Sequence, residues 1–118
     1  MIVFLSGCAP VLIGATAVAG GGYLWVQGNL ELTVEYAAVD LYEAARQTLN
    51  DMDMMVERDR HDRFGAHMSA RAVDGRKVLI RIDGQTEYVS RIRVRIGVMG
   101  DRQESQILMN TILGKVTK

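Results

Sequence analysis

Residues 66–96, AHMSARAVDGRKVLIRIDGQTEYVSRIRVRI, decide the fold of this 118-residue chain. Apolar side chains alternate with polar ones in three runs of this stretch, and successive side chains of a strand point to opposite faces. The alternation therefore predicts three strands, each with one buried face. Asp74-Gly75 lies between the first two runs and is a strong hairpin signal, and Asp83-Gly84 marks the next turn. The apolar positions are Ala66, Met68, Ala70, Ala72, Val78, Ile80, Ile82, Ile92, Val94 and Ile96.

The chain upstream of this stretch predicts a further strand, a helix and a charged edge. Residues 30–36 alternate between apolar and polar side chains, which indicates a half-buried strand. Residues 24–26 are compatible with the start of the same strand, with Gly28 as a bulge or kink. Residues 37–52 carry apolar side chains at helical spacing without Gly or Pro, which predicts an amphipathic helix of about four turns. Residues 54–64 are mostly charged, and we interpret them as an exposed edge strand that runs into a loop, with a disordered loop as the alternative.

The chain downstream predicts a second helix. Residues 97–100 begin and end with glycine and break the last strand. Asp101 then stands three residues before Glu104, an arrangement close to a capping box at the start of a helix. Gly114 weakens the last turn of this helix. Its apolar side is predicted to carry Ile107, Leu108, Ile112 and Val116.

These elements together predict an α+β two-layer sandwich in β-α-β-β-β-β-α order. We expect an antiparallel sheet of four to five strands, with two helices packed on one face. An antiparallel sheet that is covered on one side only shows this alternation of apolar and polar residues. The face predicted to lie under the helices carries Leu32, Val34, Met68, Ala70, Val78, Ile80, Ile92 and Val94.

The charged residues of the chain all follow residue 30. Fourteen Lys and Arg balance fourteen Asp and Glu, so the formal net charge is zero. A dedicated nucleic-acid-binding domain is usually strongly basic, so this balance argues against that class. Cys8 is the only cysteine, which excludes an internal disulfide and a multi-cysteine zinc site. The change in composition marks a boundary between an uncharged N-terminal segment and a charged domain.

The segment Leu5-Ser6-Gly7-Cys8 resembles the lipobox of bacterial lipoproteins, in which an aliphatic residue and two small residues precede a cysteine. The resemblance implies that the thiol of Cys8 is alkylated with a diacylglycerol and that the chain is cut before it. Acyl chains would then anchor the protein in a membrane, since each buried methylene contributes about 0.8 kcal/mol. In enteric-type bacteria an Asp after the cysteine favours the inner membrane. Ala9 at this place implies an outer-membrane location that faces the periplasm.

This interpretation divides the chain into three parts. Residues 1–7 are the remnant of a signal peptide, residues 8–22 are the lipidated cysteine with a Gly/Ala-rich tether, and residues 23–118 form the α+β domain. No basic residue precedes Cys8, and the apolar stretch before it is short for a signal peptide, so we expect translation to start upstream of Met1. Two alternatives stay open, namely an uncleaved N-terminal helix that spans a membrane and an ordinary buried cysteine.

Three further motifs resemble a family of small bacterial lipoproteins of unknown function. They are Tyr-x-x-x-x-Gly-x-Leu-Glu at residues 23–31, Asp-Gly-Arg-Lys-Val at residues 74–78 and Arg-x-Gly-x-x-Gly-Asp at residues 95–101. With the lipobox, the Gly/Ala-rich tether and an alanine-rich helix, the likeness covers nearly the whole chain. It implies a location and an architecture, and it brings no activity because the family has none assigned.

The residues predict no catalytic constellation, no metal site and no cofactor. His61, Asp59 and Asp62 have the chemistry of metal ligands, but side chains this close in a strand mostly point apart, so we interpret them as solvated surface groups. The methionines within residues 52–55 are interpreted as core filling rather than copper ligands. The glycines of residues 97–100 lack the rest of a nucleotide-binding motif and indicate a turn and a helix cap.

A basic surface is the most distinctive feature of the predicted domain. Residues 66–98 hold seven Lys and Arg against three Asp and Glu, whereas residues 31–65 hold nine acids against four arginines. Arginine side chains match carboxylates and phosphates well, so the functional interpretation is docking on an acidic protein or an anionic envelope polymer. The alternative, which we favour from the sequence, is cross-strand pairing with Glu31, Glu35, Glu57 and Glu87. The predicted basic residues on the outer face of the sheet are Arg71, Lys77, Arg81, Arg91, Arg93 and Arg95.

The leading hypothesis from the sequence is a non-enzymatic lipoprotein of the bacterial envelope, with a structural or interaction role. A carrier that holds a small apolar ligand between helices and sheet is a second hypothesis, and it requires an apolar cavity of a few hundred Å3. An enzyme is a third, and it requires a cleft with a titratable group of strongly shifted pKa. A single-span membrane protein with an uncleaved anchor is the fourth.

Overall fold

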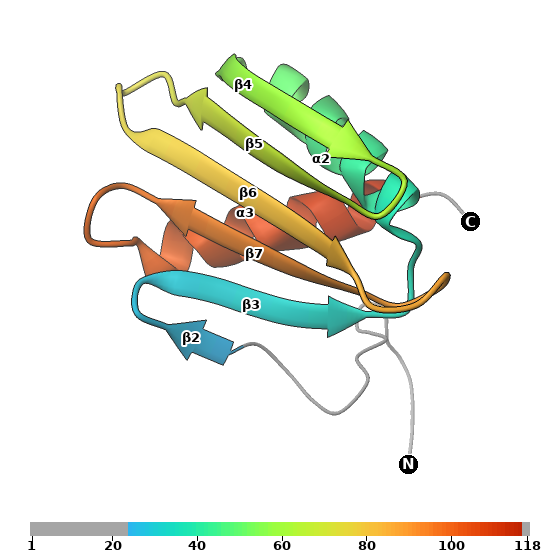
Figure 1. The fold of residues 1–118 in the computed structure, drawn as a ribbon. Helices are drawn as coiled ribbons and strands as arrows, with labels where there is room; N and C mark the ends of the chain where they lie inside the picture. The colour runs from blue at the N-terminus through green and yellow to red at the C-terminus, as the bar shows by residue number, and fades with distance from the viewer. Residues whose placement is uncertain (1–23, 117–118) are drawn as a thin grey trace.

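The computed structural model describes residues 24–116 and has two layers, an antiparallel sheet and a pair of helices (Figure 1). The sheet has six strands in the spatial order β2-β3-β7-β6-β5-β4. The predicted α+β fold with two helices on an antiparallel sheet is therefore confirmed. The elements are β2 (Leu24–Val26), β3 (Asn29–Val34), α2 (Ala38–Asp51), β4 (Met55–Asp62), β5 (Gly65–Arg71), β6 (Lys77–Gly84), β7 (Ser90–Ile96) and α3 (Arg102–Lys115).

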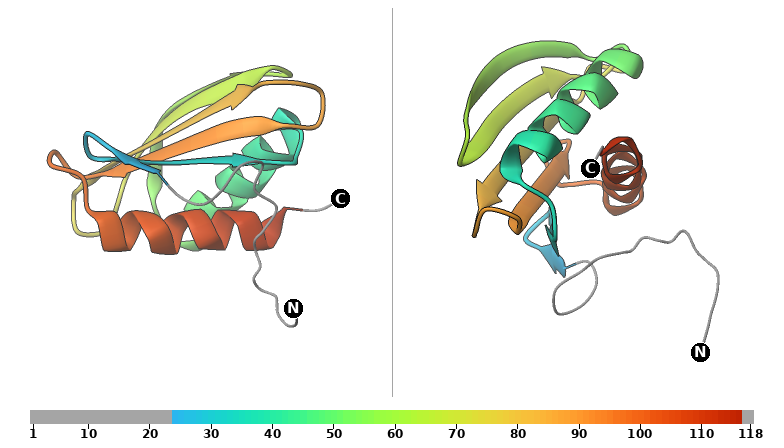
Figure 2. Two further views of the ribbon diagram at one scale, coloured as in Figure 1. Left: turned by 90° about the horizontal axis from the view of Figure 1, so that it is seen from below. Right: turned by 90° about the vertical axis from the view of Figure 1, so that its right-hand side faces the viewer.

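Both helices lie on the same side of the sheet and pack against each other (Figure 2). Helix α2 carries the chain from β3 to β4, which is the edge strand on the far side of the sheet. The chain then returns strand by strand, so that β7 pairs with β3 and leads into α3. This path leaves the opposite face of the sheet without cover from any residue in 24–116.

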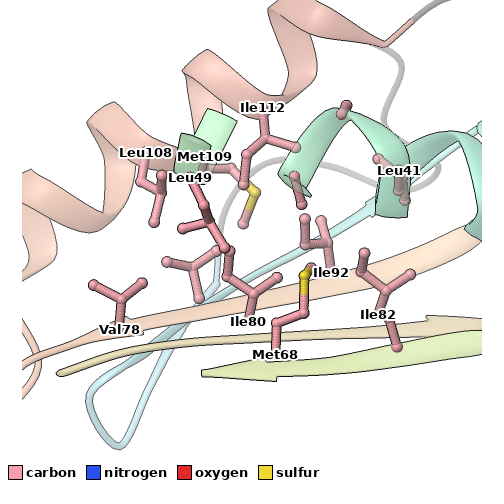
Figure 3. Close-up of a cluster of buried hydrophobic side chains, with 14 of the residues drawn as sticks. Leu41, Leu49, Met68, Val78, Ile80, Ile82, Ile92, Leu108, Met109 and Ile112 are labelled. Atoms are coloured by element: carbon pink, nitrogen blue, oxygen red, sulfur yellow. The ribbon is translucent and has the colours of Figure 1, made fainter. Parts of the chain in front are cut away.

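The core lies between the two layers. Figure 3 shows Ile80 and Ile92 of the sheet pointing toward Leu49, Met109 and Ile112 of the helices. All five side chains are fully buried, and the strands that supply the sheet side alternate between buried and exposed residues as the sequence predicts. Burial of apolar surface on this single face is what holds the helices on the sheet.

The N-terminal strand differs from the prediction. Leu24–Val26 is not the start of β3 but a separate strand, β2, which pairs antiparallel with β3. Gln27 and Gly28 form the connecting turn, and both have positive φ angles, at 51° and 86°. A two-residue hairpin turn needs this backbone geometry to match the twist of its strands. The prediction of a bulge or kink at Gly28 was therefore wrong, and the sheet has six strands rather than four to five.

Two smaller predictions also need correction. Strand β6 extends through Gly84, so the turn to β7 lies after Asp83-Gly84 rather than at it. In α3, Ile107 is 47% exposed, whereas the unpredicted Met109 is fully buried beside Leu108. Ile107 lies next to the apolar stripe of α3, so the sequence does not distinguish it from a core residue. The way in which α3 packs on the sheet decides which of these apolar side chains is buried.

The charged segment after α2 forms strand β4 and lies at the edge of the sheet, as predicted. A bulge between Val56 and Arg58 shifts its register against β5. Charged side chains and a bulge both discourage an edge strand from pairing with other chains. The disordered-loop alternative is excluded.

The residues before Leu24 carry several predictions that lie outside the described residues, among them acylation of Cys8 and the tether of residues 8–22. Within residues 24–116, neither helix has the length and apolar character needed to cross a bilayer.

Candidate functional site

The open face of the sheet, meaning the side chains of β3 to β7 that point away from the helices, carries most of the cations of the domain. The predicted six basic residues all lie on it, and Arg58 and Arg60 of β4 join them. The strand registers place these side chains opposite the face that carries the buried residues. The cations are Arg58, Arg60, Arg71, Lys77, Arg81, Arg91, Arg93 and Arg95, and the carboxylates on the same face are Glu31, Glu57, Asp62 and Asp83.

One row of this face crosses four strands and consists of basic side chains alone. Arg60 of β4 pairs with His67 of β5, His67 pairs with Arg81 of β6, and Arg81 pairs with Arg93 of β7. We call these four residues the basic row. Like charges directly opposite each other on neighbouring strands destabilise a sheet. The direct contribution of the Arg81 and Arg93 pair to folding is therefore unfavourable, before their acidic neighbours are considered.

Acidic neighbours compensate part of this charge. Arg93 is paired with Glu31 of β3, whose side chain is only 12% exposed, and Arg81 Nε lies 3.1 Å from a carboxylate oxygen of Asp83. Arg71 Nε lies 3.4 Å from Glu57. The predicted cross-strand pairing thus holds for two of the four proposed glutamates.

Other cations of the open face have different partners or none. The guanidinium of Arg95 donates hydrogen bonds to the carbonyl oxygens of Gln27, at 2.7 Å, and of Val98. Lys77 and Arg91 form no ion pair with any residue of 24–116, and Glu35 and Glu87 form none within that range either. With eight cations against four carboxylates, the open face keeps an excess of positive charge although the whole chain is neutral.

A shallow depression lies in the middle of this face and has a volume of about 430 Å3. Its cations come from three strands: Arg58 from β4, Lys77 and Arg81 from β6, and Arg93 from β7. Ser69 and His67 of β5 add a hydroxyl and an imidazole between them. Guanidinium groups bind carboxylates, phosphates and sulfates through paired N–H donors. Glu57 lines the same depression, so four cations there face one carboxylate, and the excess of positive charge suits anionic groups.

A protein-family profile described as "Protein of unknown function (DUF3568)" matches residues 1–114. The chain belongs to this family. No curated protein matches the chain. The resemblance to a family of unknown function over nearly the whole sequence is thereby confirmed, and membership brings no activity. The acylation of Cys8 stays a prediction.

A second polar cluster in this DUF3568 domain joins the edge strand to helix α2. Asp59 of β4 accepts a hydrogen bond from the hydroxyl of Tyr42 at 2.7 Å and pairs with Arg46 at 3.1 Å. His61 Nδ1 lies 3.1 Å from the other oxygen of Asp59, and its ring stacks on Tyr42. Burial, followed by the hydrogen bond to Asp59, raises the pKa of Tyr42. The cluster fastens the edge strand to the helix beneath it.

The metal-site candidate of the sequence is not assembled in the domain. Asp59 and His61 approach each other on the helix side of β4, but Asp62 accepts hydrogen bonds from the backbone N–H groups of Phe64 and Gly65 in the next turn. Residues 24–116 contain no group of three or more His, Cys, Asp or Glu side chains that could hold a metal ion. Of the nearby methionines, Met52 and Met54 pack against the core and Met55 is exposed.

The glycine-flanked turn before α3 is a turn and a cap, as predicted. The side chain of Asp101 accepts a hydrogen bond from the backbone N–H of Glu104 at 3.0 Å. Because the protein's own carboxylate occupies this helix N-terminus, the turn offers no second anion site there.

Sequence reasoning missed Arg58, Arg60 and His67 as members of the site. The signal was present, because Arg58 and Arg60 alternate with Asp59 and His61 in the period of a strand. The outward orientation of Arg58 and Arg60 could not be predicted, because the bulge after Val56 decides which of the alternating charged side chains face outward. That shift is a property of the pairing with β5.

Proposed function

We propose that this protein is a membrane-anchored lipoprotein of the bacterial envelope whose domain has a non-catalytic interaction role and binds an anionic envelope polymer through the open face of its sheet. The Leu5-Ser6-Gly7-Cys8 lipobox supports the anchor and a location at the outer membrane facing the periplasm. The cations of the open face support the polymer.

The observation that carries the proposal is the direct opposition of Arg81 and Arg93 on the two central strands, β6 and β7. A sheet face with only a structural role gains stability when opposite charges alternate across its strands. Here a like-charged pair is kept at the centre, where both side chains line the same depression. Asp83 and Glu31 offset part of the repulsion between the two arginines, and the arrangement leaves a place where two guanidinium groups can share one anion.

The dimensions of the site favour a polymer over a single small anion. Neighbouring strands lie about 4.8 Å apart, so the basic row spreads its charges over about 15 Å from β4 to β7. Cations that line up across a wide, shallow surface match the repeating charges of an extended chain. A small anion is usually held in a deeper and more enclosed pocket.

The polymer-binding proposal is tested with dextran sulfate as the probe and uncharged dextran as the reference, by isothermal titration calorimetry on the full chain. The variant Lys77→Gln with Arg81→Gln removes two cations that line the depression. We expect binding about tenfold weaker, because a hydrogen bond to a charged group contributes roughly 1.5–3 kcal/mol before solvent screening. Binding should also weaken as salt is added.

The matched control is Arg63→Gln with Arg102→Gln, which changes the net charge equally but lies in the β4–β5 turn and at the start of α3. Equal weakening by both pairs of substitutions would show that only overall charge matters and would overturn the site. If a probe protein with acidic segments binds and dextran sulfate does not, the partner of the open face is an acidic protein and not a polymer.

The anchor is tested separately by intact-mass analysis of the membrane fraction, with Cys8→Ser as the control. We expect loss of residues 1–7 and added acyl mass on Cys8, and loss of both changes in the control. A chain that retains residues 1–7 and carries an unmodified thiol contradicts the lipoprotein assignment.

A further inference from the structure

The three most exposed large apolar side chains of the described residues lie at one end of the domain. They are Val73, Val98 and Met99, with 82%, 87% and 86% of their surface exposed. Val73 lies in the β5–β6 turn, and Val98 and Met99 lie in the turn between β7 and α3. We call these side chains the apolar tips. Both turns lie at the left of Figure 1, together with the β2–β3 turn.

Contacts between these three turns show that they form one surface. The guanidinium of Arg95 bonds to the carbonyl oxygens of Gln27 and Val98 and so joins the β2–β3 turn to the β7–α3 turn. Arg76 joins the β5–β6 turn to the same place, because its guanidinium lies 3.1 Å from the carboxylate of Asp101. The apolar tips are therefore held on a rigid end of the sheet, which we call the turn end.

We propose that the turn end is a membrane-contact surface, and that the apolar tips insert into the interfacial region of an anionic lipid bilayer. Bulky apolar side chains this exposed are costly in water and favourable at the boundary between headgroups and acyl chains. The inference rests on the proposed function in one respect only, which is attachment of the chain to a membrane through Cys8.

The backbone polar groups at this end already have hydrogen-bond partners, which lowers the free-energy cost of moving them from water into a membrane interface. In the β5–β6 turn the N–H of Gly75 donates to Ala72 O at 2.9 Å, and Ala72 N–H donates to Arg76 O at 2.8 Å. Polar groups that are already hydrogen-bonded cost less to bring out of water. The turn carbonyls of Gln27 and Val98 are satisfied by Arg95 in the same way.

Two cations near the apolar tips, Lys77 and Arg95, form no ion pair with any residue of 24–116, so their charges face outward toward a negatively charged surface. Three acids lie at the same end, and Asp74, Asp101 and Glu104 are 2.9, 3.1 and 4.0 Å from Arg76. The single guanidinium of Arg76 offsets part of their negative charge. Cations near anionic lipid headgroups each contribute about 1 kcal/mol of attraction in general.

The position where the chain enters the domain favours a bilayer as the partner. Strand β2 runs from Leu24 toward the turn end and has three residues, so its start lies within about 10 Å of that end. The fifteen residues between Cys8 and Leu24 reach at most about 50 Å. An anchored domain is thus kept close to the membrane, where a weak contact becomes effective through the high local concentration.

The test uses the full chain with Cys8→Ser, so that no acyl chain holds the protein and the added thiol is unique. Val98→Cys is labelled with a polarity-sensitive fluorophore, and Tyr88→Cys, in the β6–β7 turn at the opposite end, is the matched control. Tyr88 is similarly accessible, with 69% of its surface exposed. With vesicles of phosphatidylethanolamine and phosphatidylglycerol, we expect a blue shift at position 98 and none at position 88.

A second measurement removes the tips instead of reporting on them. Val98→Ser with Met99→Ser should lower the vesicle partition coefficient about tenfold relative to the Cys8→Ser chain. Phe64→Ser with Tyr88→Ser, two exposed apolar residues at the opposite end, should leave it unchanged. The apolar N-terminal segment is common to all these chains and cancels in the comparison.

Two results overturn the inference. Equal emission shifts at positions 98 and 88 would mean that the turn end has no preference for the bilayer. A shift at position 98 that depends on protein concentration in the absence of vesicles would mean that the tips contact a second copy of the chain. Intact mass at Cys8 decides the anchor independently, because the vesicle measurements are made without acylation.

Discussion

At the scale of single residues, Gly100 shows how closely two turns approach each other. Its φ angle is +80°, and a Cβ placed on it would lie 2.6 Å from the Cα of Gly28. Gly75 has a similar φ of +91°, but a Cβ there would meet no heavy atom within 4 Å. The two glycines therefore separate the cost of an unfavourable backbone conformation from the cost of a clash between backbones.

We expect Gly75→Ala to lower the free energy of unfolding by about 1–2 kcal/mol, from the left-handed backbone alone. Gly100→Ala should lower it by more than about 3 kcal/mol, because the clash forces the β2–β3 and β7–α3 turns apart. Urea denaturation of both variants checks the difference. Equal losses would mean that the turns can separate freely.

Gly114 in α3 presents the opposite case. A Cβ on this residue would meet no heavy atom within 4 Å, and the residue lies inside the helix as the structure defines it. Gly114→Ala should raise the free energy of unfolding by about 0.5–1 kcal/mol, because alanine loses less backbone entropy when the helix forms. Thermal melting measures the gain. An unchanged or lower melting temperature would show that the last turn of α3 is frayed.

At the scale of elements, α3 is held on the sheet by a narrow stripe of side chains. Leu108 is fully buried and Ile107, its neighbour, is 47% exposed. Leu108→Ala should cost about 2–5 kcal/mol, because it leaves a cavity under the helix. Ile107→Ala should cost less than about 1 kcal/mol. Chemical denaturation of the two variants checks the orientation of α3. Similar losses of unfolding free energy would contradict the burial of Leu108 and the exposure of Ile107.

The start of the same helix depends on an ionised carboxylate. The hydrogen bond from the Glu104 N–H, followed by the Arg76 guanidinium, lowers the pKa of Asp101. The hydrogen bond from the backbone of Arg76 likewise lowers the pKa of Asp74. A lowered pKa in the folded state means that the stabilisation is present above the ordinary aspartate pKa and is lost as the pH falls through the folded value.

We therefore expect the melting temperature to stay level from neutral pH down to about pH 5 and to fall as the pH is lowered further. Asp101→Asn keeps a side-chain oxygen that can cap the helix but removes the charge, so this variant should show a weaker pH dependence over that range. Asp101→Ala should be less stable than either chain at neutral pH. If Asp101→Asn follows the pH profile of the unsubstituted chain, the carboxylate is not the titrating group.

At the scale of the whole molecule, neutrality conceals a strong asymmetry of charge. The sequence has equal numbers of acidic and basic residues, yet the open face alone holds eight cations against four carboxylates. A surface potential acts locally, so a neutral protein with one basic face can bind a negatively charged surface. This is the property on which the proposed polymer binding depends.

We expect the full chain to be retained on a sulfonate cation-exchange resin at neutral pH and low salt, despite its zero net charge. Lys77→Gln with Arg81→Gln should elute at lower salt than Arg63→Gln with Arg102→Gln, although the two variants have the same net charge. Identical elution would mean that the open face does not dominate the field of the molecule.

Patterns that repeat along the chain predicted most of this architecture. Strands β5, β6 and β7 and both helices follow from periods of two and of 3.6 residues, because burial on one face imposes those periods. The edge strand β4 was predicted from its charged composition instead. The six basic residues of the open face follow from the same alternation. The arginines of β4 did not, because a bulge breaks the period within that strand.

The sequence by itself determined which side chains of β3, β5, β6 and β7 are buried, since water drives the apolar groups of an alternating strand to one face whatever the neighbouring strand. The tertiary structure alone decided what depends on two distant segments meeting. Only strand pairing placed Arg81 opposite Arg93, and only the approach of the Gly100 turn to the Gly28 turn brought the two turns into contact. A local pattern records the environment of one residue, whereas register and turn packing are decided by contacts between residues far apart in the chain.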